Sequence, residues 1–170
     1  MRFKSFYPDE YVDSSYGIDY SDLYGKGIRG LLFDIDNTLV PHGKPETKEA
    51  VELFRRLHAM GFETCLISNN QKPRVEPFAK AMDTRYICNA HKPSVKNYRR
   101  AMKEMGTDEK TTVFVGDQLF TDVYGAKKSG IYSILVKPIH PKEEIQIVLK
   151  RRLERIVLHF YKKSLKKQGI

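Results

Sequence analysis

The amino-acid sequence predicts an α/β protein of the three-layer, doubly wound type, built on a five-stranded, mainly parallel sheet. Two observations lead to this fold class. Short apolar segments alternate with amphipathic segments of helical period between residues 29 and 137, which is typical of strands joined by crossover helices. Several apolar segments are hydrophobic without interruption, as in parallel strands that are covered on both faces. The chain of 170 residues is long enough for one such domain.

The predicted elements follow one another in a regular order. The first strand, residues 29–35, reads RGLLFDI. The helix predicted at 45–61 has an apolar face and ends at Gly61, a residue type common at helix C-termini. The residues of this face are Ala50, Val51, Phe54 and Leu57. The remaining strands are predicted at 62–68, 85–90, 111–116 and 131–137, and the remaining helices at 72–83, 94–106 and 120–130.

The chain divides into three predicted parts. Residues 1–28 form a tyrosine-rich, irregular lead-in that packs on the core and contains at most a short helix. Residues 29–140 form the α/β domain, in which the catalytic residues are expected. Residues 141–170 form a basic, amphipathic C-terminal helix. No internal repeat or low-complexity tract interrupts this arrangement.

Charge and hydropathy restrict the class of protein. The net charge is +9, and residues 141–170 hold nine Lys and Arg against three Glu. This excess favours a polyanionic partner: a nucleic acid, an anionic membrane surface or a phosphorylated substrate. No apolar run has the length of a membrane span, and residues 1–15 lack the apolar region of a signal peptide. We therefore expect a cytoplasmic protein, peripheral on the inner face of the membrane if it meets the membrane at all.

Four polar motifs each follow a predicted strand. They are DIDNT (34–38), SNN (68–70), HKP (91–93) and GDQLFTD (116–122). Taken singly, each has an ordinary explanation: strand-end carboxylates as caps, Ser68 as a helix cap, Lys92 as a surface lysine and Gly-Asp as a turn. Parallel sheets bind ligands beyond the carboxyl ends of their strands. The four motifs in this order therefore predict one shared site.

The residue types indicate phosphoryl transfer. Converging carboxylates repel one another and need a hard cation with oxygen ligands, for which Mg²⁺ is the natural choice. Asp34 can attack phosphorus as a nucleophile, and Asp36 can act as general acid and then general base. Ser68 and Lys92 can hold the phosphate oxygens. The chain has no GxxxxGK[ST] loop, which argues against a Walker-type NTPase.

With these motifs, residues 29–136 resemble the haloacid dehalogenase (HAD) superfamily, whose core is Rossmann-like. The resemblance implies that Asp34 is the nucleophile and Asp36 the general acid/base. It implies phosphate binding by Ser68 and Lys92, assisted by Thr38 and Asn69. It implies Mg²⁺ binding by Asp34, by the backbone carbonyl of Asp36, by Asp117 and, through water or from a greater distance, by Asp122. A carboxyl group at position 36 favours the phosphatase branch of the superfamily.

The resemblance extends to a subclass. The short segments 39–47 and 70–92 leave no room for the cap domain that many HAD enzymes carry. The wider pattern, from YPDEYV near the start to VGDQLFTDVYGAKKSG, is similar to the capless IIIA-type, YqeG-like phosphatases, which are related to phosphatidylglycerophosphate phosphatases. This implies dephosphorylation of phosphatidylglycerophosphate to phosphatidylglycerol. The alternatives are a nucleotide, a sugar phosphate or a phosphoprotein as substrate.

The basic tail allows three interpretations. An apolar stripe lies at helical spacing beside a cationic face. The stripe is formed by Ile145, Val148, Leu149, Leu153, Ile156 and Phe160, and the cationic face by Arg151, Arg155, Lys162 and Lys166. Residues 142–167 thus have the pattern of a helix on an anionic membrane. The same helix can instead pack its stripe on the sheet, or bind RNA. A non-catalytic RNA- or partner-binding protein on this scaffold is the second hypothesis for function, and the oligomeric state is left open.

Overall fold

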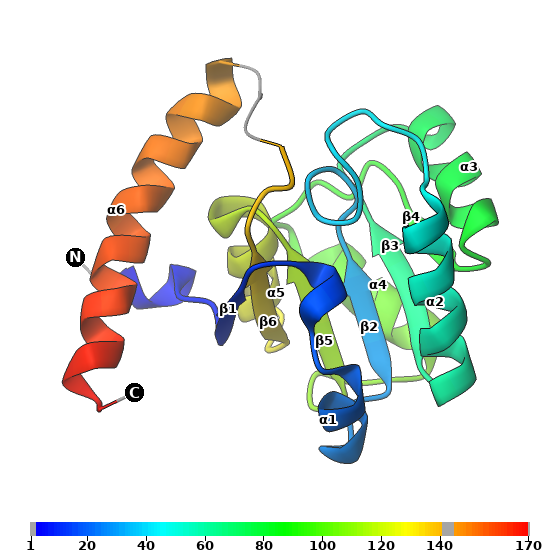
Figure 1. The fold of residues 1–170 in the computed structure, drawn as a ribbon, viewed down its shortest axis with the longest axis horizontal. Coiled ribbons are helices and arrows are strands. Elements are labelled where there is room, and N and C mark those ends of the chain that lie inside the picture. Colours follow the sequence, from blue (N-terminus) through cyan, green and yellow to red (C-terminus); the bar gives the residue numbers. More distant parts are fainter. Residues whose placement is uncertain (1–2, 141–144, 170) are drawn as a thin grey trace.

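The computed structural model describes residues 3–140 and 145–169 and contains a six-stranded sheet, in which every described strand pair is parallel. The strand order is β1-β6-β5-β2-β3-β4 (Figure 1). The strands are β1 (Glu10–Val12), β2 (Gly30–Phe33), β3 (Glu63–Ile67), β4 (Arg85–Ile87), β5 (Thr112–Gly116) and β6 (Tyr132–Val136). The predicted α/β fold with a parallel sheet is confirmed, whereas the predicted number of five strands is one too few.

The additional strand, β1, comes from the lead-in. It pairs with β6, with Glu10 opposite Ile134 and Val12 opposite Val136. The strand is only three residues long and lies in a segment rich in turn formers, so no local apolar run marks it. It becomes a strand because the edge of β6 offers unpaired backbone groups. The division of the chain at residues 28 and 140 stays a prediction.

Helices cover both faces of the sheet. The helices are α1 (Tyr20–Gly25), α2 (Lys48–Met60), α3 (Lys72–Ala81), α4 (Val95–Met105), α5 (Tyr124–Lys128) and α6 (Ile145–Lys167). Leu31 and Phe33 of β2 pack in one apolar cluster with α1, α2 and α3, and Leu32 packs in another with α4 and α5. This alternation follows from the two-residue period of a strand, and it produces the three layers.

The ends of α2 show why the sequence forms this helix. The Thr47 hydroxyl accepts a hydrogen bond from the Ala50 amide at 3.1 Å, which caps the N-terminus. Gly61 has a φ of 99°, a left-handed conformation that a glycine adopts without strain, and it ends the helix as predicted. Val51 differs from the prediction, since 36% of this residue is exposed and it does not belong to the buried face.

The strand order places the crevice of the fold between β2 and β5. The chain runs from β2 to β3 and β4 on one side, and then returns to place β5, β6 and β1 on the other. Ligands bind at such a switch point. Residues 34–47 contain no helix or strand beyond an isolated bridge between Asp36 and Val40, and residues 68–91 contain α3 and β4 of the core.

The C-terminal helix α6 lies along the β1 edge of the sheet, beside a short 3₁₀ helix at Phe3–Phe6 (Figure 1). It docks through Glu154, Val157 and Tyr161, which are buried. Most of the predicted apolar stripe is exposed, namely Val148, Leu149, Leu153, Ile156 and Phe160. The side chain of Ile145 and residues 142–144 lie outside the described part. Among the described residues, no helix combines the length and apolar character needed to cross a membrane.

Candidate active site

The four polar motifs meet at the carboxyl ends of four adjacent strands. Asp34 follows β2, Ser68 follows β3, Lys92 lies in the loop after β4, and Asp117 follows β5. The ladder continues into the site, because the Asp34 amide donates to the Val115 carbonyl at 3.0 Å. The structure thus brings the four motifs together at one edge of the sheet, as the prediction of one shared site requires.

Three buried carboxylates form the centre of the site. One oxygen each of Asp34, Asp117 and Asp122 lies within 4.8 Å of the others. Asp122 belongs to a π-helical turn, Leu119–Val123, and one of its oxygens accepts hydrogen bonds from the amides of Asp117 and Gln118, both at 3.1 Å. This approach needs Gly116, because a Cβ at that position would lie 2.5 Å from an Asp122 oxygen.

Lys92 joins two of these carboxylates. Its ammonium nitrogen lies 2.7 Å from Asp34 Oδ1 and 2.6 Å from Asp122 Oδ1. Burial would by itself lower the pKa of Lys92, but the negative charges of Asp122 and Asp34 outweigh burial and raise the pKa above its ordinary value. Lys92 therefore stays protonated and supplies a fixed positive charge in the site.

Burial raises the pKa of the carboxyl groups in this cluster. The pKa of Asp34 is raised to about 6, mainly by loss of solvation, with Lys92 opposing the shift and Asp122 adding to it. The pKa of Asp117 is raised well above its ordinary value, again by burial first and then by repulsion from Asp34 and Asp122. A cluster of this kind favours a bound cation, which would stabilise the ionised carboxylates.

Asp36 occupies a separate network. Asn70 Nδ2 donates to Asp36 Oδ2 at 2.6 Å, and Arg74 Nη2 and the Gly43 amide both donate to Asp36 Oδ1 at 2.8 Å. The Asp36 carboxylate thus faces α3 and the loop after β2, and it is not one of the three clustered carboxylates. The Nε of Arg74 is buried and has no hydrogen-bond partner within the described part of the chain.

The predicted phosphate-binding residues have different surroundings. Ser68 is buried, and its hydroxyl accepts a hydrogen bond from the Asn70 amide at 3.1 Å. Asn69 Oδ1 accepts from the Lys92 amide at 2.8 Å, so that Asn69 positions the lysine loop. Thr38 Oγ1 lies 3.2 Å from Asp117 Oδ1, to which it donates. Direct contact of these residues with phosphate stays a prediction.

The lead-in supports the loop that carries the first motif. Ser15 donates from its hydroxyl to the Thr38 carbonyl at 2.7 Å, and the Tyr16 hydroxyl donates to the Leu39 carbonyl at 2.6 Å. Burial raises the pKa of Tyr16 to about 12, which keeps this donor protonated. Ser15 and Tyr16 of the lead-in therefore support the loop of the first motif, a role that the sequence did not predict.

Helix α6 also reaches the site. Arg151 forms an ion pair with Asp117 Oδ2, and its Nη1 donates to the Asp117 carbonyl at 2.5 Å. Glu154 lies 2.9 Å from Arg151 Nη1 and accepts from the Leu119 amide at 2.9 Å. The prediction that Arg151 belongs to an exposed cationic face is wrong, whereas Arg155, Lys162 and Lys166 are exposed.

The donor set suits a hard divalent cation. Asp34, Asp117 and Asp122 supply oxygen ligands within one cluster. All three are buried at the carboxyl edge of the sheet, whose strands are otherwise apolar. Lys92 and Arg151 supply positive charge that compensates part of this cluster. Thr38 fixes the second oxygen of Asp117. The three carboxylates could therefore hold a metal ion.

Sequence reasoning missed several residues of the site. Asn70 is the third residue of the SNN motif, and this position marks it as a further polar residue at that strand end. Arg74, Arg151 and Glu154 carry no local signal, because their partners are 38, 34 and 35 residues away in the chain. Only the folded chain brings them to the carboxylates.

Comparison with known proteins agrees with this geometry. Residues 43–130 match the family model of haloacid dehalogenase-like hydrolases. The chain is 33% identical over 165 residues to "Probable phosphatase YqeG" of Bacillus subtilis, covering 96% of both chains. It is 27% identical over 162 residues to "Phosphatidylglycerophosphate phosphatase 1, chloroplastic/mitochondrial" of Arabidopsis thaliana, covering 88% of this chain and 45% of that protein.

The fold has matches among solved structures. The crystal structure of a hypothetical protein from Xanthomonas campestris superposes with a TM-score of 0.57 at 18% identity, over 75% of this chain and 76% of that chain. At this level of identity the likeness concerns the fold. The family model and the Bacillus relative carry the assignment, and the resemblance predicted from the four motifs is confirmed: the chain is an enzyme that belongs to the haloacid dehalogenase-like hydrolase family.

Proposed function

We propose that the protein is a Mg²⁺-dependent phosphomonoester hydrolase that works through an aspartyl-phosphate intermediate on Asp34. The observation that carries this proposal is the cluster of Asp34, Asp117 and Asp122 with Lys92 between two of them. Bound Mg²⁺ would neutralise charge on the transferring phosphoryl group and reduce its repulsion from the carboxylate nucleophile. The names of the two curated relatives also support a phosphatase.

In the first step, a carboxylate oxygen of Asp34 attacks phosphorus, and the bond between phosphorus and the leaving oxygen breaks. Lys92 and Ser68 hold the equatorial phosphate oxygens, with Thr38 and Asn69 keeping the neighbouring groups in place. Asp36, in its protonated form, gives its proton to the leaving alkoxide. The products of this step are the free alcohol and the phosphorylated side chain of Asp34.

In the second step, Asp36 acts as the base. It takes a proton from a water molecule, whose oxygen attacks phosphorus and displaces the Asp34 carboxylate. Inorganic phosphate leaves, and Asp36 is again protonated for the next cycle. Asn70, Arg74 and the Gly43 amide fix the position of Asp36 in both steps, since all three donate to its carboxylate.

We propose a lipid phosphomonoester, phosphatidylglycerophosphate, as the substrate. The loop 34–47 is short, and the site carries no inserted module between β2 and α2 that would enclose a small metabolite. This supports assignment to the capless subclass and a substrate presented by a larger surface. The Arabidopsis relative, whose name states this substrate, supports the same choice.

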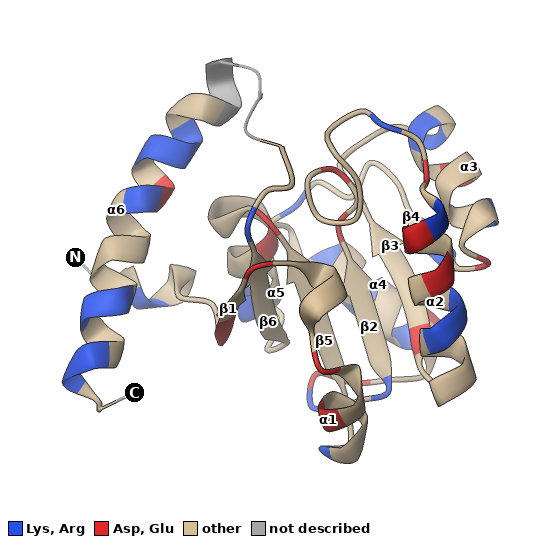
Figure 2. Cartoon of the chain, viewed as in Figure 1, with Lys and Arg blue, Asp and Glu red and all other residues tan. Residues whose placement is uncertain are grey.

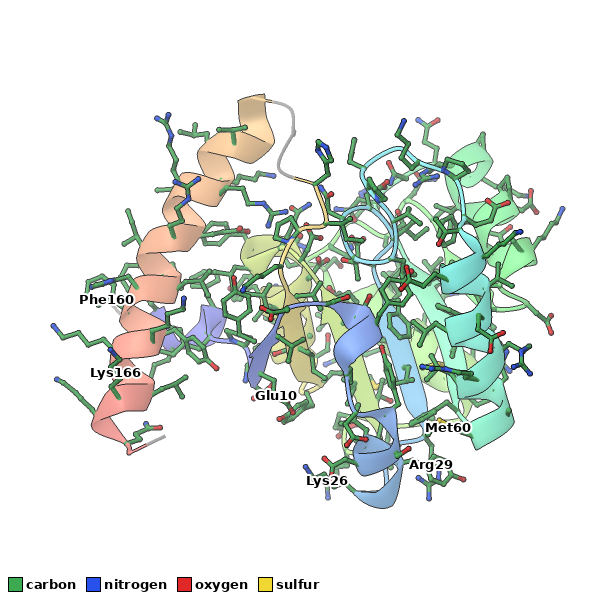
Figure 3. The ribbon with its side chains drawn as sticks, in the orientation of Figure 1. Glu10, Lys26, Arg29, Met60, Phe160 and Lys166 are labelled. Atoms are coloured by element: carbon green, nitrogen blue, oxygen red, sulfur yellow. The ribbon has the colours of Figure 1, made fainter. Side chains whose placement is uncertain are left out.

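The outer face of α6 is proposed to hold the enzyme on an anionic membrane. Leu149, Leu153 and Ile156 are 61%, 53% and 51% exposed. Basic residues accompany them along the helix (Figure 2), and each basic residue near an anionic surface contributes about 1 kcal/mol. Phe160 and Lys166 lie on this helix, well apart from the α1–α2 side where Met60 is labelled (Figure 3). Such a helix would keep a peripheral enzyme beside its lipid substrate.

Phosphate release tests the chemistry and the substrate together. Vesicles containing phosphatidylglycerophosphate and Mg²⁺ should release phosphate with the wild-type protein and not with Asp34→Asn. Turnover of soluble esters alone would exclude the lipid substrate. A folded protein that hydrolyses neither the lipid nor p-nitrophenyl phosphate would favour the binding-protein hypothesis.

Vesicle sedimentation tests the membrane surface. Leu153→Glu should reduce binding to vesicles of phosphatidylglycerol, because it places a negative charge in the exposed apolar stripe. Val51→Glu is the matched control, since Val51 is also an exposed apolar residue but lies on α2. Equal binding of both variants to the vesicles would exclude α6 as the anchor. Binding of the wild-type protein to RNA and not to vesicles would favour the nucleic-acid alternative.

A further inference from the structure

Arg151 is a charged residue of the site that the proposed reaction does not use. Its guanidinium group contacts both the carboxylate and the carbonyl of Asp117. Helix α6 delivers it from a fixed position, because Val157 and Tyr161 are buried against the sheet edge and Glu154 accepts from the Leu119 amide. Helix α6 therefore places the Arg151 guanidinium in direct contact with Asp117, an expected metal ligand.

Arg151 also lines a cavity that begins at Asp117. The cavity has a volume of about 310 Å³ and lies between α6 and the ends of β1 and β6. Its charged residues are Asp117, Arg151, Glu154 and Arg155, and its other walls are mainly apolar. The cavity thus extends the site on the side of α6, and two of its four charged residues are arginines.

The balance of charge in the site changes when a divalent cation binds. Fully ionised, Asp34, Asp117, Asp122 and Glu154 face two cations, Lys92 and Arg151, which leaves two negative charges uncompensated. A divalent cation would compensate these two charges. It would also draw on the Asp117 carboxylate that holds Arg151, so that Arg151 would keep Glu154 as a partner and would be the cation best placed to accept a new anionic group.

We propose that Arg151 is a specificity-determining residue that binds a second acidic group, located on the leaving group of the substrate, in the cavity beside Asp117. The planar fork of a guanidinium suits a carboxylate or a phosphodiester. The apolar walls accommodate the carbon chain between the two acidic groups. This inference rests on the proposed phosphatase function and deepens it: the substrate class is a phosphomonoester that carries another anion.

A pair of non-hydrolysable phosphonates tests the proposal by binding alone. 3-Phosphonopropionate carries a carboxylate, and propylphosphonate has the same length without it. With saturating Mg²⁺, calorimetry should show that the wild-type protein binds 3-phosphonopropionate at least about tenfold more tightly, the gain expected of one charged hydrogen-bonded pair. Arg151→Gln should abolish this preference, and Arg151→Lys should retain part of it because the charge remains without the fork.

Arg152→Gln is the matched control. Arg152 is the next residue of α6 and is exposed. Its replacement by Gln removes the same positive charge from the helix. This variant should keep the full preference for 3-phosphonopropionate. If Arg152→Gln and Arg151→Gln lose the preference equally, general attraction to the basic helix explains it and the proposal is overturned. Equal weakening of both phosphonates by Arg151→Gln would also overturn it, because Arg151 would then act on the shared phosphonate.

Metal affinity provides a second readout. Titration with Mg²⁺ alone should show that Arg151→Gln binds the ion at least as tightly as the wild type, since a competing cation has left Asp117. Weaker Mg²⁺ binding would mean that Arg151 merely positions Asp117, contrary to the proposal. If the wild type binds neither phosphonate in a Mg²⁺-dependent way, the proposed phosphatase function itself fails. If it binds both equally, only the role of Arg151 fails.

Discussion

The surroundings of Asp34 and Asp36 differ in their partners and hardly at all in their burial. The two side chains are 11% and 12% exposed. Asp34 lies among other carboxylates and shares one lysine with Asp122. Asp36 has three donors of its own, from Asn70, Arg74 and the Gly43 amide.

This difference separates two chemical tasks within one short motif. A carboxylate among like charges gains most from a shared cation, which suits a nucleophile that must approach an anionic phosphate. A carboxylate held by dedicated donors is fixed in position, which suits a group that exchanges protons with a leaving group and with water. The strand alone cannot create this difference, because both residues come from the end of β2.

The largest expected effect comes from Asp34→Asn. Hydrolysis of p-nitrophenyl phosphate should fall by at least about 10³-fold, because the nucleophile is lost while the shape is kept. Asp83→Asn is the control: Asp83 is an exposed residue with a φ of 50°, a conformation that asparagine tolerates. Comparable rates for wild type and Asp34→Asn would remove Asp34 from the mechanism and erase the contrast between the two carboxylates.

Asp36→Asn should lower turnover by roughly 10² to 10³-fold, as expected for the loss of a general acid/base. The increase in melting temperature caused by Mg²⁺ should remain, because the three clustered carboxylates are unchanged. Loss of the Mg²⁺ effect in this variant would place the Asp36 side chain in the metal site and contradict the separation of tasks.

Arg74→Gln should have a smaller effect, about tenfold on turnover, because it removes one charged hydrogen bond from Asp36 and leaves Asn70 and the Gly43 amide in place. Steady-state kinetics should show the loss in kcat. Arg99→Gln on the exposed side of α4 is the control and should match the wild type. An effect of Arg74→Gln on Mg²⁺ affinity instead of kcat would join the two surroundings that the structure separates.

The smallest effect concerns pH and stability. The pKa of Asp34 is raised from 3.8 to about 6 in the folded protein, mainly by burial. For such a group, the contribution to stability is complete below the unfolded value and is lost as the pH rises through the folded value. Without Mg²⁺, the melting temperature should therefore fall between pH 5 and pH 8 by a few degrees more in the wild type than in Asp34→Asn.

Thermal melts with and without Mg²⁺ complete this test. At pH 8 the ion should restore stability to the wild type, whereas at pH 5 its effect should be smaller because protons compete for Asp34. Asp36→Asn should show the pH dependence of the wild type. An identical fall in all three proteins would show that Asp34 does not carry the dependence.

The centre of the fold and the convergence of motifs were accessible from sequence for a physical reason. Uninterrupted apolar strands such as β2 specify a parallel sheet, and parallel strands bring residues such as Asp34 and Asp117 to one edge. Even the helix end at Gly61 has a local cause in its left-handed backbone. Each of these features is predicted by a local pattern that spans only a few residues.

The edges of the molecule were not accessible in this way. Strand β1 has three residues and is defined by a partner 124 residues away. In α6, helical period alone selects the apolar stripe as the docking face, but the buried face contains Arg151 and Glu154 in contact with the core. A charged residue docks in preference to a leucine here because Asp117 and the Leu119 amide need partners. Periodicity carries no information about those distant needs.

Both ends of the chain close the same side of the sheet. Asp9 and Glu10 meet Ser133 and Ile134 across the outermost strand pair, and the rings of Phe3 and Phe160 stack at 5.7 Å. During synthesis on the ribosome, β1 therefore has no neighbour in the sheet until β6 emerges.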